Sequence, residues 1–137
     1  MLAIALVLTA VAFPKGEAIL HAPTKSVTVK VELARTTAQK TQGLGGRRTL
    51  ARNAGMAFIF EDATRGSFSM RNTTIPLSIA FWGKRGRIQQ IFDMTPCGRA
   101  RCRSYTPRYP FWGALEVNRG AFRRWGVSTG DLVEIRG

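Results

Sequence analysis

Polar side chains that could bind a ligand interrupt the most apolar part of the chain. Residues 71–74 read Arg-Asn-Thr-Thr and lie between two apolar runs, at 56–60 and 77–82. Two more polar residues, Glu116 and Asn118, stand in a later apolar run and at its end. Buried polar groups need hydrogen-bond partners, so these side chains must satisfy one another or a ligand. The sequence therefore predicts one ligand-binding patch made of Arg71, Asn72, Thr73, Glu116 and Asn118.

A purely structural role for the same residues stays open. Asn72 and Thr73 have side chains that stabilise turns, and Pro76 follows them. Glu116 can pair with Arg71 as part of the scaffold. The two interpretations differ in one feature, which is whether these side chains converge on an open pocket or only on each other.

Few residues have the chemistry of a catalytic centre. The only histidine, His21, lies near the N-terminus, so a serine or cysteine nucleophile in the core would have no histidine base. No predicted strand is followed by a phosphate-binding glycine loop or a dinucleotide fingerprint, and we expect no cofactor. A small hydrolase or transferase that uses a carboxylate, Glu116 or Asp93, remains an alternative, since folding could bring these two acids together.

The two cysteines, Cys97 and Cys102, lie close together in a segment flanked by prolines. In an exported protein, two cysteines at this spacing predict a disulfide. A redox-active pair is the alternative, although its usual spacing is Cys-x2-Cys at the start of a helix. Two thiols and one distant histidine leave a zinc ion short of ligands, so we predict no metal site.

The chain is short and basic. Its 137 residues are enough for one domain with a core. It carries 21 Lys and Arg against 8 Asp and Glu, a formal net charge of +13. Such a field attracts polyanions, so a cationic surface that binds anionic envelope polymers or nucleic acid is a second hypothesis for function. A solvated basic surface without a partner is the alternative. Most aromatic residues fall at the apolar positions of predicted strands, which is typical of a core rather than of base stacking.

The N-terminus opens with an uncharged apolar run of the length of a signal-peptide core, too short to cross a bilayer as a helix. We predict a signal peptide at 1–18, a linker at 19–25 and one domain at 26–137. Small residues fit cleavage after Ala18, and an earlier site lies after Ala12. We therefore expect a protein exported to the periplasm or secreted, which makes a nucleic-acid partner unexpected. An apolar run retained as an uncleaved anchor is the alternative.

Local patterns predict seven short strands and two short helices. Residues 26–33 alternate strictly between apolar and polar, as in a half-buried strand. Thr36 and Gln39 form a capping box for a helix that Gly43 ends. Asn118 is expected to cap a second helix at 119–125. The remaining strands are expected at 55–60, 67–70, 77–82, 87–94, 113–118 and 132–135.

These elements favour a mainly β (α+β) fold. They lack the regular alternation of strands and helices that a parallel sheet needs. We expect a small curled antiparallel sheet or a partly closed β-barrel with two short helices, because closure leaves few exposed strand edges.

Several sequence blocks are similar to those of one protein family. The chain resembles the DUF192 family, also called UPF0127, small bacterial and archaeal proteins of unknown function, over about residues 27–135. The resemblance implies a mainly β fold, often behind a signal peptide, and it implies no activity. The blocks that carry it are Gly-Leu at 43–44, Gly-Met-Ala-Phe-Ile-Phe at 55–60, Phe-Ser-Met-Arg-Asn-Thr-Thr-Ile-Pro-Leu at 68–77, Gly-Arg-Ile at 86–88, Pro96 and Cys97 with Cys102 and Tyr105, Leu-Glu-Val-Asn at 115–118 and Gly-Asp at 130–131.

The chain departs from the family pattern at three places. Ser78 stands where the family usually has Asp, and residues 69–71 are Ser-Met-Arg where it usually has Trp-Met-Lys. Residues 45–46 are Gly-Gly where the family usually has Met-Phe. A family activity that needed the Asp carboxylate would be in doubt for this chain, because Ser78 cannot supply it.

Overall fold

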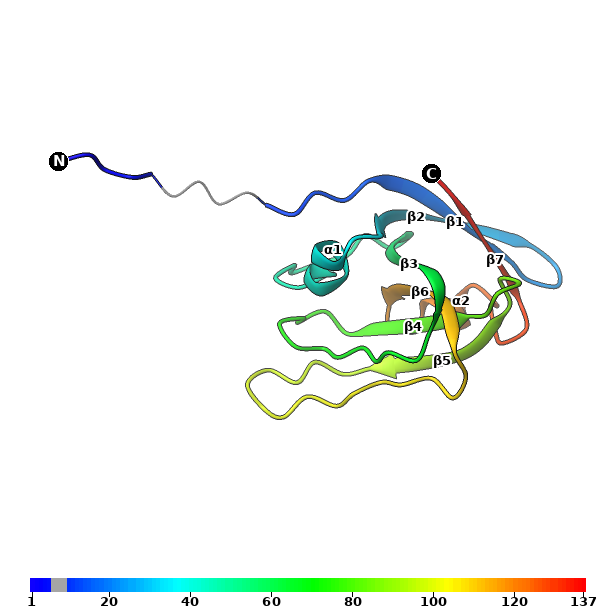
Figure 1. Ribbon diagram of the computed structural model, residues 1–137. Coiled ribbons are helices and arrows are strands. Elements are labelled where there is room, and N and C mark those ends of the chain that lie inside the picture. Colours follow the sequence, from blue (N-terminus) through cyan, green and yellow to red (C-terminus); the bar gives the residue numbers. More distant parts are fainter. Residues whose placement is uncertain (6–9) are drawn as a thin grey trace.

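Seven strands form one sheet in the computed structural model, which describes residues 1–5 and 10–137 (Figure 1). In chain order they are β1 (Lys15–His21), β2 (Ser26–Ala34), β3 (Ala54–Thr64), β4 (Leu77–Trp82), β5 (Ile88–Met94), β6 (Phe111–Asn118) and β7 (Leu132–Arg136). The helices are α1 (Thr37–Gln42) and α2 (Ala121–Arg124). No helix within the described residues is both long and apolar enough to span a membrane. The structure confirms a mainly β fold with two short helices.

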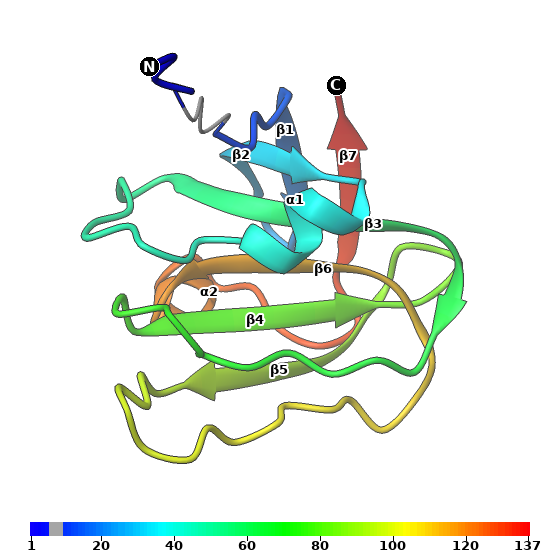
Figure 2. The ribbon, with the colours of Figure 1, turned by 60° about the vertical axis from the view of Figure 1, so that its left-hand side comes forward.

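The sheet curls until its two edge strands meet. Its order is β5-β4-β6-β3-β2-β1-β7, and every neighbouring pair is antiparallel except β2 and β3. At the open side, Arg87 bridges to Leu132, and the amide of Val133 donates to the carbonyl of Gly86 at 2.8 Å. The partly closed barrel is confirmed. The sheet is mixed rather than purely antiparallel, because α1 lies in the connection that brings β3 parallel to β2 (Figure 2).

Apolar side chains pack on both faces of this sheet. The concave face receives buried residues from all seven strands, and Ala121 and Phe122 of α2 pack against them. The convex face is apolar chiefly over β3, β4, β5 and β6, where Leu44, Met70 and Tyr105 from the connecting segments cover it. Strand β4 is buried along its whole length, since apolar side chains pack on both of its sides. A continuous apolar sequence is typical of a strand that is buried on both faces.

Helix α1 begins and ends as its sequence predicts. The hydroxyl of Thr36 accepts from the amide of Gln39 at 3.1 Å, and the Gln39 side chain accepts from the amide of Thr36 at 3.0 Å. Gly43 follows the last helical residue with a φ of 47°, a conformation that favours glycine. Both ends of the helix are therefore determined by local residues.

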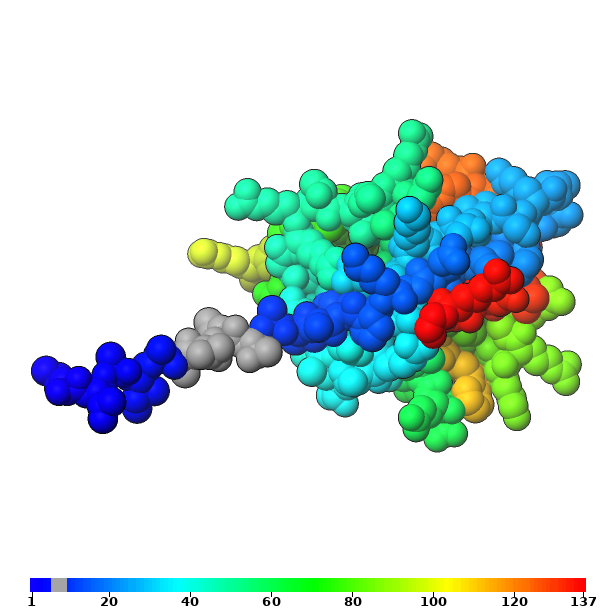
Figure 3. Space-filling view, turned by 90° about the horizontal axis from the view of Figure 1, so that it is seen from above, coloured from blue at the N-terminus to red at the C-terminus, as the bar shows by residue number. Residues whose placement is uncertain are grey.

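Strand β1 was not anticipated. It lies between β2 and β7, pairing with both in antiparallel register, and Figure 3 shows it beside the C-terminal strand. Residues 19–21, which we assigned to a linker, form its second half, and Ala18 and Leu20 are fully buried. The predicted signal peptide stays a prediction: it includes residues 6–9, which lie outside the described residues. The strand was missed because its sequence has no clean alternation, and pairing on both sides stabilises it.

Three other boundaries also differ from expectation. The strand predicted at 67–70 is only an isolated bridge between Phe68 and Tyr105. Strand β3 continues to Thr64, beyond the predicted end at Phe60, because it keeps pairing with β6 past a bulge. Helix α2 follows Gly120, whose φ is 82°, and no side chain caps it. Strand pairing sets the first two boundaries, which no local window shows, whereas the start of α2 follows the left-handed backbone of Gly120.

Replacing Gly55 with Ala should destabilise the fold. A Cβ atom at Gly55 would overlap the backbone oxygen of Glu116 on β6, so the two central strands would have to move apart. Overpacking of this kind typically lowers the free energy of unfolding by about 1–3 kcal/mol. Gly66→Ala is the matched control, because its nearest contact would be the Thr64 hydroxyl at 3.5 Å. Urea unfolding measures both, and equal stabilities would contradict the close approach at Gly55.

Candidate functional site

A cleft of about 590 Å³ opens on the convex face of the sheet. Residues of β3 and β6 line its floor, α1 contributes one wall and the segment 66–73 another. Four of the five side chains predicted to bind a ligand line this cleft, namely Arg71, Asn72, Thr73 and Glu116. The structure thus brings residues that are distant in the sequence together around an open cavity.

Glu116 contributes the one carboxyl group among the described residues that line the cleft. Its cross-strand neighbours, Met56 and Ile79, are fully buried apolar residues. Only 6% of Glu116 is exposed, and its carboxyl group forms no ion pair within the described residues. Its oxygens are not among the buried atoms that lack a partner, so they remain accessible from the cleft. Burial raises the pKa of this carboxyl to about 8. At neutral pH it is therefore mostly protonated and can donate a hydrogen bond into the cleft.

Phenylalanine rings line much of the rest of the cleft. Phe58 and Phe68 meet edge to face at 4.9 Å between centroids, and Phe60 and Phe111 do so at 5.4 Å. The ammonium of Lys40 lies 3.9 Å from the centroid of the Phe60 ring. Sequence reasoning assigned such aromatic residues to the core and did not single out Lys40. Nothing in the sequence of α1 indicates that this lysine lies over β3.

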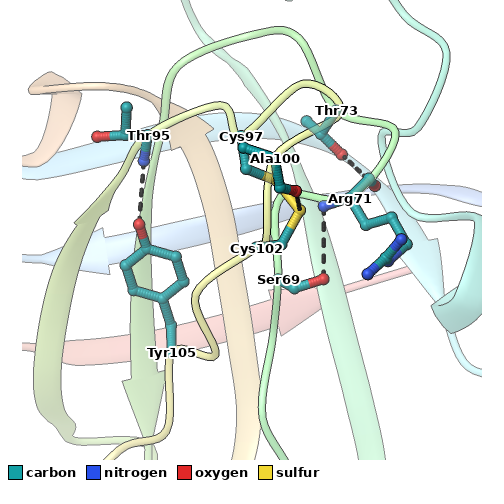
Figure 4. Close-up of a disulfide and its surroundings, with 8 residues drawn as sticks. All are labelled: Ser69, Arg71, Thr73, Thr95, Cys97, Ala100, Cys102 and Tyr105. Atoms are coloured by element: carbon teal, nitrogen blue, oxygen red, sulfur yellow. Dashed lines mark hydrogen bonds between the residues drawn. A yellow bond between two sulfur atoms is a disulfide. The ribbon is translucent and has the colours of Figure 1, made fainter.

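A tight turn holds the predicted patch in place. The amide of Thr73 donates to the carbonyl of Met70 at 3.0 Å, and Asn72 has a φ of 62°. Turns with a positive φ at the third position favour Gly or Asn, so the backbone alone gives a reason for Asn72. Figure 4 shows Arg71 and Thr73 beside each other, with the Thr73 hydroxyl donating to the Arg71 carbonyl at 3.5 Å. The amide of Gly46 also donates to the Asn72 carbonyl at 2.9 Å.

Asn118 does not belong to the cleft. Its side-chain amide donates to the carbonyls of Leu50 and Ala51 at 2.8 and 3.3 Å, so it holds the segment that precedes β3. This contact also corrects the prediction that Asn118 caps α2. The predicted scaffold pair of Arg71 with Glu116 does not form either, as no ion pair joins them in the part of the chain that the structure describes.

The cysteine loop supports the cleft indirectly. Cys97 and Cys102 lie at disulfide-bonding distance, with their Cα atoms 5.3 Å apart (Figure 4). Beyond them, Tyr105 and Phe68 exchange two backbone hydrogen bonds of 2.7 and 3.0 Å. The Tyr105 hydroxyl accepts from the amide of Thr95 at 3.1 Å. The cysteines do not line the cleft, but their loop continues into the residue that holds Phe68 there.

Asp93 and Glu116 do not form the acid–base pair considered from the sequence. Asp93 pairs across the sheet with Ser78, whereas Glu116 pairs with the next residue, Ile79. Neighbouring residues on a strand face opposite sides, so the two acids lie on opposite faces of the sheet. The Ser78 hydroxyl donates to Asp93 at 2.6 Å and accepts from the Gly120 amide at 2.9 Å. Within the described residues, no three His, Cys, Asp or Glu side chains gather as metal ligands would.

Replacing Glu116 with Gln should flatten the pH dependence of stability. Burial raises the pKa of this acid from 4.5 to about 8, so the folded protein binds the proton more tightly than the unfolded chain. The resulting stability is fully present below pH 4.5 and is lost as the pH rises towards about 8. The loss is at most about 1.4 kcal/mol per pH unit. Urea unfolding at a series of pH values measures this slope.

The variant Glu116→Gln carries an amide that keeps the shape of the acid but has no proton to lose in this pH range. Its unfolding free energy should therefore fall less than that of the wild type over the same pH range. Asp62→Asn, at an exposed position of β3, is the matched control and should keep the wild-type slope. Parallel profiles for the wild type and Glu116→Gln would contradict the raised pKa.

Comparison with known proteins places the chain in a group without a known activity. No curated protein matches it. A solved structure from Sinorhizobium meliloti 1021, whose description gives it a provisional role as a transcription regulator, is 32% identical, with a TM-score of 0.85 over 93% of this chain and 98% of its own. A protein of unknown function from Novosphingobium aromaticivorans DSM 12444 is 30% identical, with a TM-score of 0.84 over 96% of this chain and 93% of its own.

The family assignment rests on a match that begins inside β1. The sequence profile of the DUF192 family, described as "Uncharacterized ACR, COG1430", matches residues 19–135. This span contains the cleft, the turn at 70–73 and the cysteine loop. The two solved structures share the fold over nearly the whole chain. The chain therefore belongs to the DUF192 family.

Proposed function

We propose that the protein is a non-catalytic binding module that holds a small ligand in the cleft around Glu116. The observation that carries the proposal is the carboxyl group of Glu116, which is buried, lines an open cleft and forms no ion pair among the described residues. The carboxyl oxygens are not among the buried, unpartnered atoms of the described residues, so water in the open cleft can reach them. A ligand that displaces this water and hydrogen-bonds to the carboxyl would make a specific contact in largely apolar surroundings.

The shape and lining of the cleft suit a small molecule. Ligand sites are typically concave, mostly apolar and furnished with a few placed polar groups. Here the phenylalanine rings supply the apolar surface, and the turn at 70–73 presents Arg71, Asn72 and Thr73. The turn is held by backbone hydrogen bonds and by the Thr73 hydroxyl, which leaves the side chains of Arg71 and Asn72 available to a ligand.

The arrangement supports binding rather than acid–base catalysis. The described residues lining the cleft include one carboxyl group and no histidine or cysteine. Acid–base catalysis usually combines two titratable groups whose pKa values are set apart. Asp93, the other candidate acid, faces the opposite side of the sheet.

Fragments that bind the protein should occupy the cleft and depend on Glu116. We expect binders from a fragment library to shift the NMR amide signals of Phe58, Ser69 and Glu116. Glu116→Leu should weaken them by about tenfold, the effect of losing one hydrogen bond to a buried group. Asp93→Asn, on the opposite face, is the control and should leave affinity unchanged.

The stability of Glu116→Leu separates a binding role from a scaffold role. A buried acid without partners contributes nothing that Leu cannot replace, so the variant should be at least as stable as the wild type in urea unfolding. A marked loss of stability, or fragments that bind equally well to Glu116→Leu, would contradict the proposed site.

We further propose that the protein is exported and that its leader ends at Ala12. Ala10 and Ala12 supply the small side chains that signal peptidases need, and the run before them is apolar. A cut after Ala18 would remove half of β1, which pairs with β2 and β7. A cut after Ala12 leaves β1 whole. The paired cysteines also suit an oxidising compartment.

Mass spectrometry of protein recovered from the periplasm or medium should find Phe13 as the first residue. Ala12→Asp should block this cleavage, because an acidic side chain does not fit the position before the cut. A chain beginning at Ile19 would contradict the proposed site. Recovery of uncut protein from the cytoplasm alone would contradict export.

A further inference from the structure

The cleft has two chemically different ends. Glu116 lies opposite Met56 in the β3–β6 pairing. Phe60 lies four residues further along β3, which at about 3.3 Å per residue is about 13 Å away. The ammonium of Lys40 lies over the Phe60 ring. A neutral hydrogen-bond donor and a cation therefore stand at opposite ends of an apolar floor.

The positive charges of Arg71 and Lys40, which line the cleft, are not fully balanced by nearby acids. Arg71 is exposed and has no ion pair within the described residues. Burial lowers the pKa of Lys40, and the nearby Glu61 carboxylate only partly opposes that effect. An anion bound beside Lys40 would offset the cost of desolvating the ammonium. The net charge of +13 draws anions towards the protein as a whole.

The middle of the cleft suits an apolar, ring-containing body. Phe60 and Phe68 are partly exposed and present surface to the cleft, whereas Phe58 and Phe111 are buried and support them from the core. Phe68 packs against both buried rings, at 4.9 and 6.2 Å between centroids. Edge-to-face arrays of this kind extend readily to one further ring. An apolar body can therefore cover the exposed parts of Phe60 and Phe68.

Glu116 restricts what the far end of the ligand can be. Its carboxyl is mostly protonated at neutral pH and so donates a hydrogen bond to an acceptor oxygen. A second carboxylate placed here would lose its solvation in apolar surroundings. The charged group of a ligand is therefore better placed at the Lys40 end.

Resting on the proposed binding role, we propose that the natural ligand is a small, largely apolar monocarboxylate. Its carboxylate lies at Lys40, with Arg71 as the second cation that lines the cleft; its apolar body lies on the exposed parts of Phe60 and Phe68, and an oxygen at its other end accepts a hydrogen bond from Glu116. This assigns a ligand class and an orientation to the cleft.

Titration calorimetry with p-methoxyhydrocinnamate tests the ligand class. This molecule carries a carboxylate, an aromatic ring and a terminal ether oxygen. We expect it to bind about tenfold more tightly than the corresponding alcohol or amine, the size of one charge-assisted contact. The double variant Lys40→Ala, Arg71→Ala should lose this preference and leave the alcohol unaffected. Lys84→Ala, Arg85→Ala removes the same charge from an exposed hairpin and should have no effect.

Two further measurements test the orientation. Glu116→Leu should weaken p-methoxyhydrocinnamate by about tenfold and hydrocinnamate, which lacks the ether oxygen, much less. Raising the pH from about 7 to about 9 should weaken p-methoxyhydrocinnamate more than hydrocinnamate, because Glu116 then becomes an anion and can no longer donate to the ether oxygen. Equal losses for both acids in either measurement would overturn the orientation.

The possible failures are distinguishable. If the alcohol or amine binds as tightly as the acid, or if Lys40→Ala, Arg71→Ala has no effect, the ligand class is wrong. If none of these probes binds while other fragments still shift the cleft signals, the ligand class is also wrong and the binding role stands. If no fragment of any charge occupies the cleft, the binding role itself fails.

Discussion

The position of β6 between β3 and β4 is the constraint on which the rest of the structure depends. Both of its neighbours pair with it in antiparallel register, and that register decides which side chains face each side. Leu115 and Val117 point to the concave core, whereas Ala114 and Glu116 point to the convex face. The absence of a side chain at Gly55 lets β3 approach the Glu116 backbone closely in this register. A slip by one residue would move the acid into the concave core.

Burying the acid Glu116 on this apolar face costs free energy, and it also supplies the hydrogen-bond donor of the proposed binding site. A buried charge would be far more costly than a buried neutral acid, so Glu116 keeps its proton at neutral pH. The neighbouring apolar side chains supply no hydrogen-bond partner, and the open cleft is the side from which one can reach the acid. A hydrogen-bond donor in such surroundings discriminates strongly between ligands with and without a suitable acceptor. In the proposed binding role, this burial would give the cleft a basis for selectivity.

The N-terminal strand plays a separate part, which is to complete the curl. β1 links β2 to β7, and the segment before β7 reaches back to the start of β5. This arrangement leaves little unpaired strand edge. It also explains why the domain begins earlier than alternation alone suggests: Ala18 and Leu20 fill the concave core although they precede the first clearly alternating strand.

The sequence alone determined several strands and the first helix, because strand alternation and helix capping depend on residues only a few positions apart. Three features are of this kind: the alternation of β2, the apolar run of β4 and the capping box at Thr36. The blocks that resemble DUF192 identified the family, and the patch at 71–73 did reach a cleft.

Only the tertiary structure decided what depends on register and on packing between distant segments. It gave Asn118 a contact with Leu50 instead of a place in the cleft, and it put Asp93 and Glu116 on opposite faces. It also brought Lys40 over Phe60. These relations follow from hydrogen-bonding between strands far apart in the chain. A change of one position in that register reverses every face, so no local window of sequence can report it.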